Sequence, residues 1–270
     1  METIQNEKRF GFGENWKNFI EKSFDQKKVE LSKRHMLKFL QRNDLDSLSF
    51  LDIGCGSGLH SLAAFQLGAA RVVSFDYDPK AVEATRSLCE YAGQPQNWIV
   101  MQGSVLDKSF LGTLPQCDLV YSWGVLHHTG DVWQAIRNAA DRVRKGGRFY
   151  IALYSADVHI DPTPEFWLDV KQKYLGESWF KKKWMEWWYI WRFQMRYNPF
   201  VLPMILWQII QYKKNRGMDY FTDIRDWLGG WPMEFCYDND VIKFASEHLS
   251  LELINIATGE ANTEFLFKKL

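Results

Sequence analysis

The 270-residue sequence has no net charge, no closely paired cysteines and no long apolar run. Its 33 basic and 33 acidic residues balance, which gives no reason to expect nucleic-acid binding. The four cysteines are scattered without a CxxC pair, so neither a disulfide framework nor a metal site is expected. The polar opening METIQNEKRF lacks the apolar core of a signal peptide. These absences predict a reduced, cytoplasmic protein.

Aromatic residues are abundant and unevenly placed. Nine of the thirteen tryptophans fall between residues 155 and 235. The run PFVLPMILWQII in this segment has only 12 residues, whereas a membrane-spanning helix needs about 20, so no span is expected. Basic residues beside the tryptophans, such as lysines 181–183, leave peripheral membrane contact open. We prefer a buried cap helix with a solvated basic face, with most of these tryptophans in its core.

From residue 49 onward, short apolar runs alternate with helical segments, which predicts a doubly wound α/β fold around a parallel sheet. Strands are expected at 49–54, 71–76, 97–103, 117–123 and 147–155, with helices at 57–67, 79–92 and 131–144. The alternation breaks after Ser155 and resumes with a helix near residue 237 and strands at 251–257 and 263–269. Residues 14–42 have the apolar spacing of one or two helices.

The stretch FLDIGCGSGLH joins the first strand to a helix through three glycines. Its GxGxG spacing differs from the GxGxxG of turns that bind a pyrophosphate. Glycines at such a turn let a ligand approach the backbone. Asp52, at the end of the strand, would repel a pyrophosphate but attract an ammonium group. We therefore predict a nucleoside ligand that carries an amino-acid tail.

The next two strands end in residues suited to the nucleoside. Asp76, 22 residues after Gly54, can accept both hydroxyls of a ribose. Tyr77 beside it offers a ring face to adenine. Ser104, or the backbone amide of Val105, can contact the adenine edge.

Five motifs in order, DIGCGSG, VVSFDYDP, GSVLD, DLVYSWGVLHHTGD and VRKGGRFYIALY, resemble those of class I S-adenosylmethionine-dependent methyltransferases. The resemblance covers residues 49–155 and extends to the two closing strands. It implies a Rossmann-like sheet of seven strands, the last antiparallel, with S-adenosyl-L-methionine as methyl donor and S-adenosyl-L-homocysteine as product. FGFGENWKNFIEKSF, DWLGGWP and NTEFLFKK are further similar to a bacterial subgroup of methyltransferase-domain proteins, often linked to glycan or secondary-metabolite pathways.

The resemblance assigns cofactor binding to Asp52, Gly54, Gly56, Gly58, Asp76, Ser104 and Val105. It also places Ser122 and Trp123, at the end of the fourth strand, beside the methionine part of the cofactor. Many relatives have an aspartate where Ser104 stands, so this chain departs from the usual recognition of the adenine amine.

These patterns divide the chain into three parts. Residues 1–48 are expected to form a helical lid, with Trp16 and Phe19 either over the cofactor or packed against the first strand. Residues 49–155 and 236–270 form the cofactor-binding core. Residues 156–235 form an aromatic-rich helical cap inserted after the fifth strand, where the acceptor binds.

The acceptor must be held in line with the methyl group, and a hydroxyl acceptor usually needs a base. His127 and His128 in the loop after the fourth strand are the candidates, although such a pair can also brace the loop. Candidate acceptor-binding residues are Tyr154, His159 (which follows the fifth strand together with Asp157), Trp227, Trp231 and Glu234.

The sequence therefore favours methylation of a small molecule, at oxygen, such as a glycan or a secondary-metabolite precursor. A methyltransferase acting on a peptide, a protein or RNA is the alternative, and a non-catalytic cofactor-binding scaffold is a third possibility. Neutral charge and the absence of a recognisable RNA-binding module count against RNA. A monomer and a homodimer both remain open.

Overall fold

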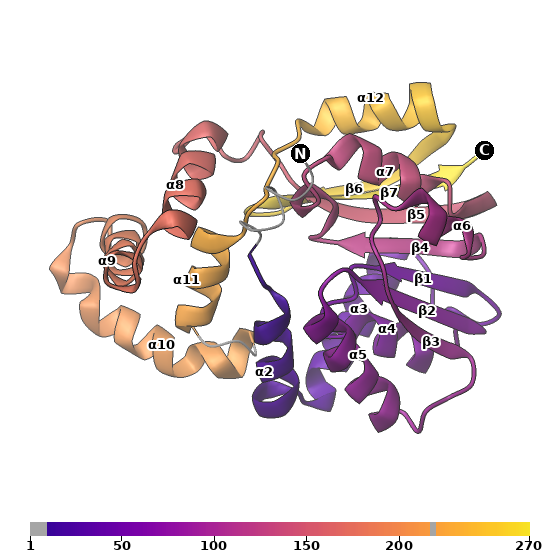
Figure 1. Ribbon diagram of the computed structural model, residues 1–270, viewed down its shortest axis with the longest axis horizontal. Helices are drawn as coiled ribbons and strands as arrows, with labels where there is room; N and C mark the ends of the chain where they lie inside the picture. Colours follow the sequence, from indigo (N-terminus) through magenta and orange to yellow (C-terminus); the bar gives the residue numbers. More distant parts are fainter. Residues whose placement is uncertain (1–9, 217–219) are drawn as a thin grey trace.

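A computed structural model describes residues 10–216 and 220–270. Its centre is a seven-stranded mixed sheet of order β3-β2-β1-β4-β5-β7-β6, in which only β7 runs antiparallel to its neighbours (Figure 1). The strands are β1 Ser49–Ile53, β2 Arg71–Asp76, β3 Trp98–Gln102, β4 Cys117–Trp123, β5 Val143–Tyr154, β6 Leu251–Thr258 and β7 Asn262–Lys269. The predicted fold class and all seven predicted strands are confirmed.

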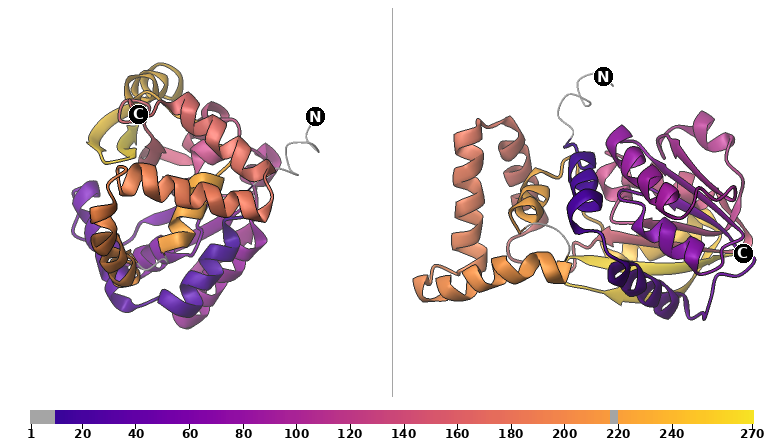
Figure 2. Two further views of the ribbon diagram at one scale, coloured as in Figure 1. Left: turned by 90° about the vertical axis from the view of Figure 1, so that its left-hand side faces the viewer. Right: turned by 90° about the horizontal axis from the view of Figure 1, so that it is seen from below.

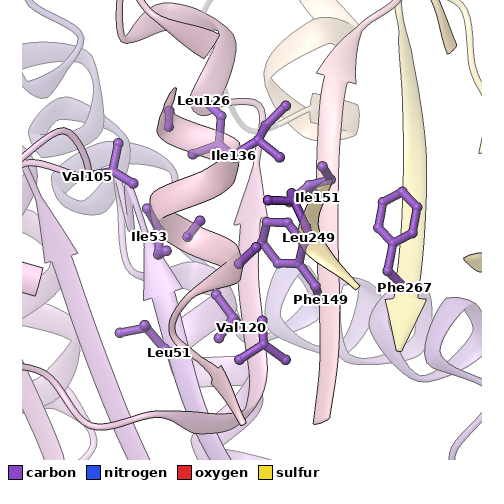
Figure 3. Close-up of a cluster of buried hydrophobic side chains, with 14 of the residues drawn as sticks. Leu51, Ile53, Val105, Val120, Leu126, Ile136, Phe149, Ile151, Leu249 and Phe267 are labelled. Carbon is purple, nitrogen blue, oxygen red and sulfur yellow. The ribbon is translucent and has the colours of Figure 1, made fainter. Parts of the chain in front are cut away.

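Helices cover both faces of this sheet, because the side chains of each strand alternate between two apolar clusters. Leu51 and Ile53 of β1 pack on one face with α7 (Val132–Ala140) and α12 (Asp238–Leu249), where Figure 3 shows Ile136 and Leu249 against the strands. Phe50 faces the other way, toward a second cluster that includes residues of three more helices. These are α3 Gln26–Leu40, α4 Leu59–Gln66 and α5 Pro79–Tyr91.

The amino-terminal helical region forms two helices, α2 (Gly13–Ser23) and α3. The break falls at Asp25, whose side chain accepts a hydrogen bond from the amide of Lys28 and so caps α3. The helix expected at 131–144 ends earlier, at Ala140, because β5 already begins at Val143 and pairs there with Cys117. A short helix, α6 (Lys108–Gly112), was not expected; Asp107 caps it.

Four helices between β5 and α12 form a separate layer beside the carboxyl ends of the strands, with α2 between them and the sheet (Figure 2). They are α8 Pro164–Gly176, α9 Trp179–Tyr189, α10 Leu202–Arg216 and α11 Tyr220–Gly229. Their own apolar core includes Trp167, Tyr174, Ile190 and Leu228.

The expectation that most tryptophans of this segment are buried is wrong. Five of the nine are exposed: Trp179, Trp184, Trp187, Trp191 and Trp207. Their exposure has a simple cause, since α9 and α10 turn their other faces, with Trp188 and Ile205, toward the core of the cap.

In the part of the chain that the structure describes, no helix combines the length and apolar character needed to cross a bilayer. Among the same residues, no group of histidines, cysteines and carboxylates is arranged to hold a metal ion.

Candidate active site

The glycine turn between β1 and α4 lies at the carboxyl edge of the sheet. The amides of Gly54 and Cys55 both donate to the carbonyl of Phe75, at 2.8 and 3.1 Å, which ties the turn to β2. Gly54 has a φ of 73°, and a Cβ there would lie 2.3 Å from Val125 of the loop after β4. Glycine is therefore required here both by the backbone conformation and by the close approach of that loop.

Asp76 connects the glycine turn to the second strand. One of its carboxylate oxygens accepts from the amide of Gly56 at 3.0 Å, and the other accepts from the amide of Asp78 at 2.9 Å. Burial raises the pKa of this carboxyl, whereas the backbone hydrogen bonds lower it. A carboxylate offers about four acceptor positions, so these two bonds leave it capacity for ribose hydroxyls. Tyr77 beside it is exposed.

Asp52 lies beneath the turn, with only 2% of its surface exposed. It accepts a hydrogen bond of 2.5 Å from Ser61 of α4, and the Ser61 hydroxyl also lies 2.7 Å from that of Ser74 on β2. Burial raises the pKa of the Asp52 carboxyl to about 7. The immediate partner of Asp52 is therefore a helix serine, and direct contact with an ammonium group stays a prediction.

The third and fourth strands place the remaining cofactor candidates along the same edge. The Ser104 hydroxyl accepts from the amide of Leu106 at 3.2 Å, and the carbonyl of buried Val105 accepts from the Asn138 side chain at 2.9 Å. Ser122 is buried and donates to the carbonyl of Ile53 at 2.9 Å, whereas Trp123 next to it is exposed. Ser122 thus bridges β4 to β1 at the start of the glycine turn.

The amino-terminal helix α2 spans the edge from the sheet to the cap (Figure 2). The Trp16 indole lies so close to the glycine turn that a Cβ on Gly56 would be 3.1 Å from it. The amide of Gly13 donates to Asp78 at 2.8 Å. On the other side, the amide of Phe10 donates to the carbonyl of Trp231 at 2.9 Å. The side chain of Phe19, the other predicted lid residue, lies outside the described part.

The two loop histidines have different surroundings. His127 is fully buried, and its Nδ1 accepts from the amide of Tyr154 at 3.4 Å. Its Nε2 is buried and has no hydrogen-bond partner. His128 is partly exposed, and its Nδ1 lies 2.7 Å from the carbonyl oxygen of Pro232 in the cap. Burial lowers the pKa of His127 well below the usual range, and nearby His128 and Lys171 act in the same direction.

These hydrogen bonds assign the tautomers of both neutral rings. His127 accepts at Nδ1, so its proton resides on Nε2 and no basic nitrogen remains. His128 must donate from Nδ1, because a carbonyl can only accept, so its lone pair resides on Nε2.

Tyr154, at the end of β5, is the centre of an aromatic group that joins the sheet to the cap. Its ring centroid lies 4.5 Å from that of His127, 5.6 Å from that of Trp227 and 6.2 Å from that of His159. Trp227 stacks on His159 at 5.8 Å. Three of the predicted acceptor-binding residues, Tyr154, His159 and Trp227, are therefore brought together beside the loop histidines.

Two other predicted acceptor residues have structural partners. Glu234 accepts from the amide of Val132 at 2.9 Å, at the first residue of α7. A carboxylate there neutralises the positive end of the helix dipole. Trp231 contributes its carbonyl to the contact with Phe10. Asp157, exposed at the start of the cap, accepts from the amide of Asp238 at 2.8 Å.

A buried lysine in this group was not predicted from the sequence. Lys171 of α8 has only 1% of its surface exposed, donates to the carbonyl of Trp227 and lies 4.3 Å from the Trp227 ring centroid. Burial lowers the pKa of its amine to about 7, although the nearby carboxyl of Asp226 raises this pKa. A signal was present in the sequence: Lys171 follows Trp167 by four residues and precedes Tyr174 by three, which is one helix face.

Asp226 of α11 was missed as well. It accepts a hydrogen bond from the side chain of Asn15 on α2, and burial raises the pKa of its carboxyl to about 7. Asn15 and Asp226 are 211 positions apart, so no local pattern pairs them.

Comparison with known proteins agrees with this geometry. Residues 51–151, from β1 to β5, match the family model of the methyltransferase domain. The chain carries a class I S-adenosylmethionine-dependent methyltransferase domain. The match includes the glycine turn, Asp76 and both loop histidines, and it ends before the cap.

Curated relatives match this methyltransferase domain over a short stretch. The ribosomal protein L11 methyltransferase of Dechloromonas aromatica (strain RCB) is 47% identical over 60 residues, which are 22% of this chain and 20% of that protein. That of Aeromonas hydrophila subsp. hydrophila is 46% identical over 57 residues. The chain thus spans about a fifth of the length of these relatives.

Solved structures share the fold over much more of the chain. The magnesium protoporphyrin IX methyltransferase of Synechocystis PCC 6803, solved with S-adenosylhomocysteine bound, covers 100% of this chain with a TM-score of 0.56. This chain covers 99% of that protein, at 12% sequence identity. At such identity the likeness concerns the fold alone.

Proposed function

We propose that this protein transfers a methyl group from S-adenosylmethionine to an oxygen of a small-molecule acceptor, with His128 as the base. The observation that carries the proposal is the 2.7 Å contact between His128 Nδ1 and the carbonyl of Pro232. This contact assigns the basic lone pair to Nε2. The loop that carries His128 packs on the glycine turn through Val125. A histidine oriented in this way suits removal of a hydroxyl proton near neutral pH.

The residues at the sheet edge fit the proposed cofactor. Asp76 would accept the ribose hydroxyls, since its carboxylate already lies at the turn, 3.0 Å from the amide of Gly56. Trp16 and Tyr77 would flank the nucleoside with aromatic rings. The bound cofactor would supply an electrophilic methyl group on a sulfonium sulfur, and the protein would supply its position and shield it from water.

The other cofactor candidates have supporting roles in this proposal. Gly54 and Gly58 would shape the turn, while Asp52 would brace it through Ser61. Ser104 and Val105 would border the adenine, and Ser122 and Trp123 the methionine part. S-adenosylhomocysteine would be the product.

His127 would have a different role from that of His128. Its Nδ1 accepts from a backbone amide and its pKa is strongly lowered, so it would stay neutral and present the Nε2 proton as a donor. Together with the indole NH of Trp227, which is likewise buried without a partner, it would donate to polar atoms of the acceptor.

The acceptor would lie between the His128 loop and the cap, against Tyr154, His159 and Trp227. Aromatic walls with few polar groups suit a small organic molecule. The neighbouring amine of Lys171 would favour an acceptor with an anionic group, because such a partner would stabilise the charged form of a buried lysine. Trp231 and Glu234 would hold the rim of this region through their backbone and helix contacts.

The alternative is a peptide, protein or RNA acceptor. The partial relatives are protein methyltransferases by name, but the segment shared with them is only about a fifth of each protein. Incubation with S-adenosylmethionine labelled at the methyl group and a fractionated lysate would separate these functions. We expect label in the small-molecule fraction, in a product with the stability of an ether or ester. Label confined to protein or RNA would overturn the proposed acceptor class, and label in no fraction would argue against catalysis.

A further inference from the structure

The outer face of α9 is formed by aromatic side chains. Phe180, Trp184 and Trp187, with Trp191 in the following turn, recur at steps of four, three and four residues and therefore share one face. Their exposed fractions lie between 42% and 78%. The only acidic side chain of α9, Glu186, is buried on the opposite face, where it accepts from the hydroxyl of Tyr174 at 3.0 Å. The helix thus has its one negative charge inside and its rings outside.

The segment that follows also exposes apolar side chains. Phe200, Leu206, Trp207 and Ile210 are between 52% and 89% exposed, whereas Ile205 faces the core of the cap. We call residues 179–210 the arm. Figure 1 shows α9 and α10 at the end of the molecule, with α11 and α2 between them and the strands. The helices of the arm therefore lie apart from the strands of the sheet.

The size of this apolar surface is unusual. The six aromatic side chains named above, each of roughly 150–250 Å², are 42–89% exposed and leave roughly 600–1,000 Å² of apolar surface uncovered. A typical monomeric protein exposes a largest patch of roughly 300–600 Å². An apolar area of this size indicates a surface that is covered by a partner.

The charge of the segment indicates what that partner is. The arm contains five lysines and arginines and a single acidic residue, which leaves 28 basic and 32 acidic residues for the rest of the chain. A neutral protein thus has a cationic, aromatic end and an anionic body. Tryptophans with adjacent lysines and arginines are typical of helices that lie in the interface of anionic bilayers. Two copies of the arm placed face to face would bring like charges together, which disfavours a dimer through this surface.

We propose that the arm docks on the surface of an anionic lipid bilayer. The rings of the arm insert among the lipid headgroups, while Lys181 contacts lipid phosphates. Lys181 is already near Glu177, at 2.8 Å, but this ion pair is largely exposed and is easily exchanged for a phosphate. Docking holds the protein at the membrane without a spanning helix.

Vesicle flotation of the full-length protein tests this proposal. We expect the wild type to float with vesicles of phosphatidylcholine containing 30% phosphatidylserine and to remain unbound with phosphatidylcholine alone, and added salt should weaken the binding. The triple variant Trp184→Ser/Trp187→Ser/Trp207→Ser should lose at least tenfold in partition coefficient. The matching variant with Phe at the three positions should retain binding.

A control with serine at two other exposed apolar positions, Leu31→Ser/Tyr91→Ser, should bind like the wild type. Circular dichroism of each variant verifies its fold. Absence of wild-type binding to the anionic vesicles, or equal binding by the serine triple variant, would overturn the proposal. The proposal would also be overturned if the wild type were dimeric by light scattering and did not bind vesicles, and if the serine triple variant were monomeric. The arm would then cover a second copy of the chain.

Discussion

The Nδ1 atom of His128 lies 2.7 Å from the carbonyl oxygen of Pro232, so a turn of the cap determines which ring nitrogen of a sheet loop carries the proton. Phe12 of the amino-terminal segment packs on the same ring, with centroids 5.1 Å apart. Three segments from distant parts of the chain therefore meet at one histidine.

Replacing this histidine should remove the base. His128→Ala should lower kcat by about 100- to 10,000-fold, the usual contribution of general base catalysis. The dissociation constant of the cofactor should not change, because the ring acts on the acceptor. Turnover is measured as label transferred from saturating methyl-labelled S-adenosylmethionine to the small-molecule fraction, and His248→Ala, at an exposed histidine of α12, is the control. A kcat close to that of the wild type would make His128 a structural residue.

Removing the carboxylate at the end of β2 should abolish cofactor binding. Asp76→Ala should weaken the affinity for S-adenosylhomocysteine by at least about 100-fold, because hydrogen bonds to a charged group contribute about 1.5–3 kcal/mol each. Titration calorimetry measures this change. Glu90→Gln, at an exposed position of α5, should bind normally. Undiminished affinity of Asp76→Ala would contradict the ribose assignment.

The contact between α2 and the glycine turn predicts a role for Trp16 in cofactor affinity. Trp16→Ala should weaken cofactor binding about tenfold, which corresponds to about 1.4 kcal/mol and to the loss of one aromatic contact. Lys17→Ala changes the next residue of the helix, whose side chain is exposed, and is the matched control. Equal affinities for the two variants in calorimetry would exclude a lid function for the helix.

The buried amine of Lys171 should make stability depend on pH. Its pKa is about 7 in the folded protein and about 10.4 in the unfolded chain, so the unfolded state binds more protons between these values. Stability conferred by this site should therefore rise with pH above 7, by at most about 1.4 kcal/mol per pH unit. Lys171→Met removes the titrating group and keeps an apolar chain.

Urea denaturation of the wild type and of Lys171→Met at pH 7.0, 7.5, 8.0 and 8.5 measures this dependence. The advantage of the methionine variant should shrink as pH rises, because other titrating groups are common to both proteins. A difference in unfolding free energy that stays constant over this range would show that Lys171 does not change its charge there. Lys173→Met, at an exposed position of the same helix, is the control.

Elements fixed by local patterns could be predicted from the sequence, and those fixed by distant packing could not. The strands and the glycine turn were found because apolar runs and glycine spacing carry their own signal. The orientation of α9 could not be predicted, because a stripe of tryptophans at helical spacing has the same pattern whether it faces the core or solvent. Glu186 decides that orientation, and its burial depends on Tyr174 in another helix.

The same limit applies within the candidate site. Lys171 lies in the polar sequence KQK and was passed over, although the core of the cap encloses it. Glu234 was expected near the acceptor, but its contact with Val132 could not be inferred from residues 102 positions apart.

The five exposed tryptophans of the cap have a practical consequence for spectroscopy. They are more than a third of the thirteen indoles, and all five already contact water in the folded protein. Their fluorescence emission should therefore be red-shifted and readily quenched by acrylamide before any unfolding takes place. Total intrinsic fluorescence will under-report the loss of the sheet, and far-ultraviolet circular dichroism is the better measure of its unfolding.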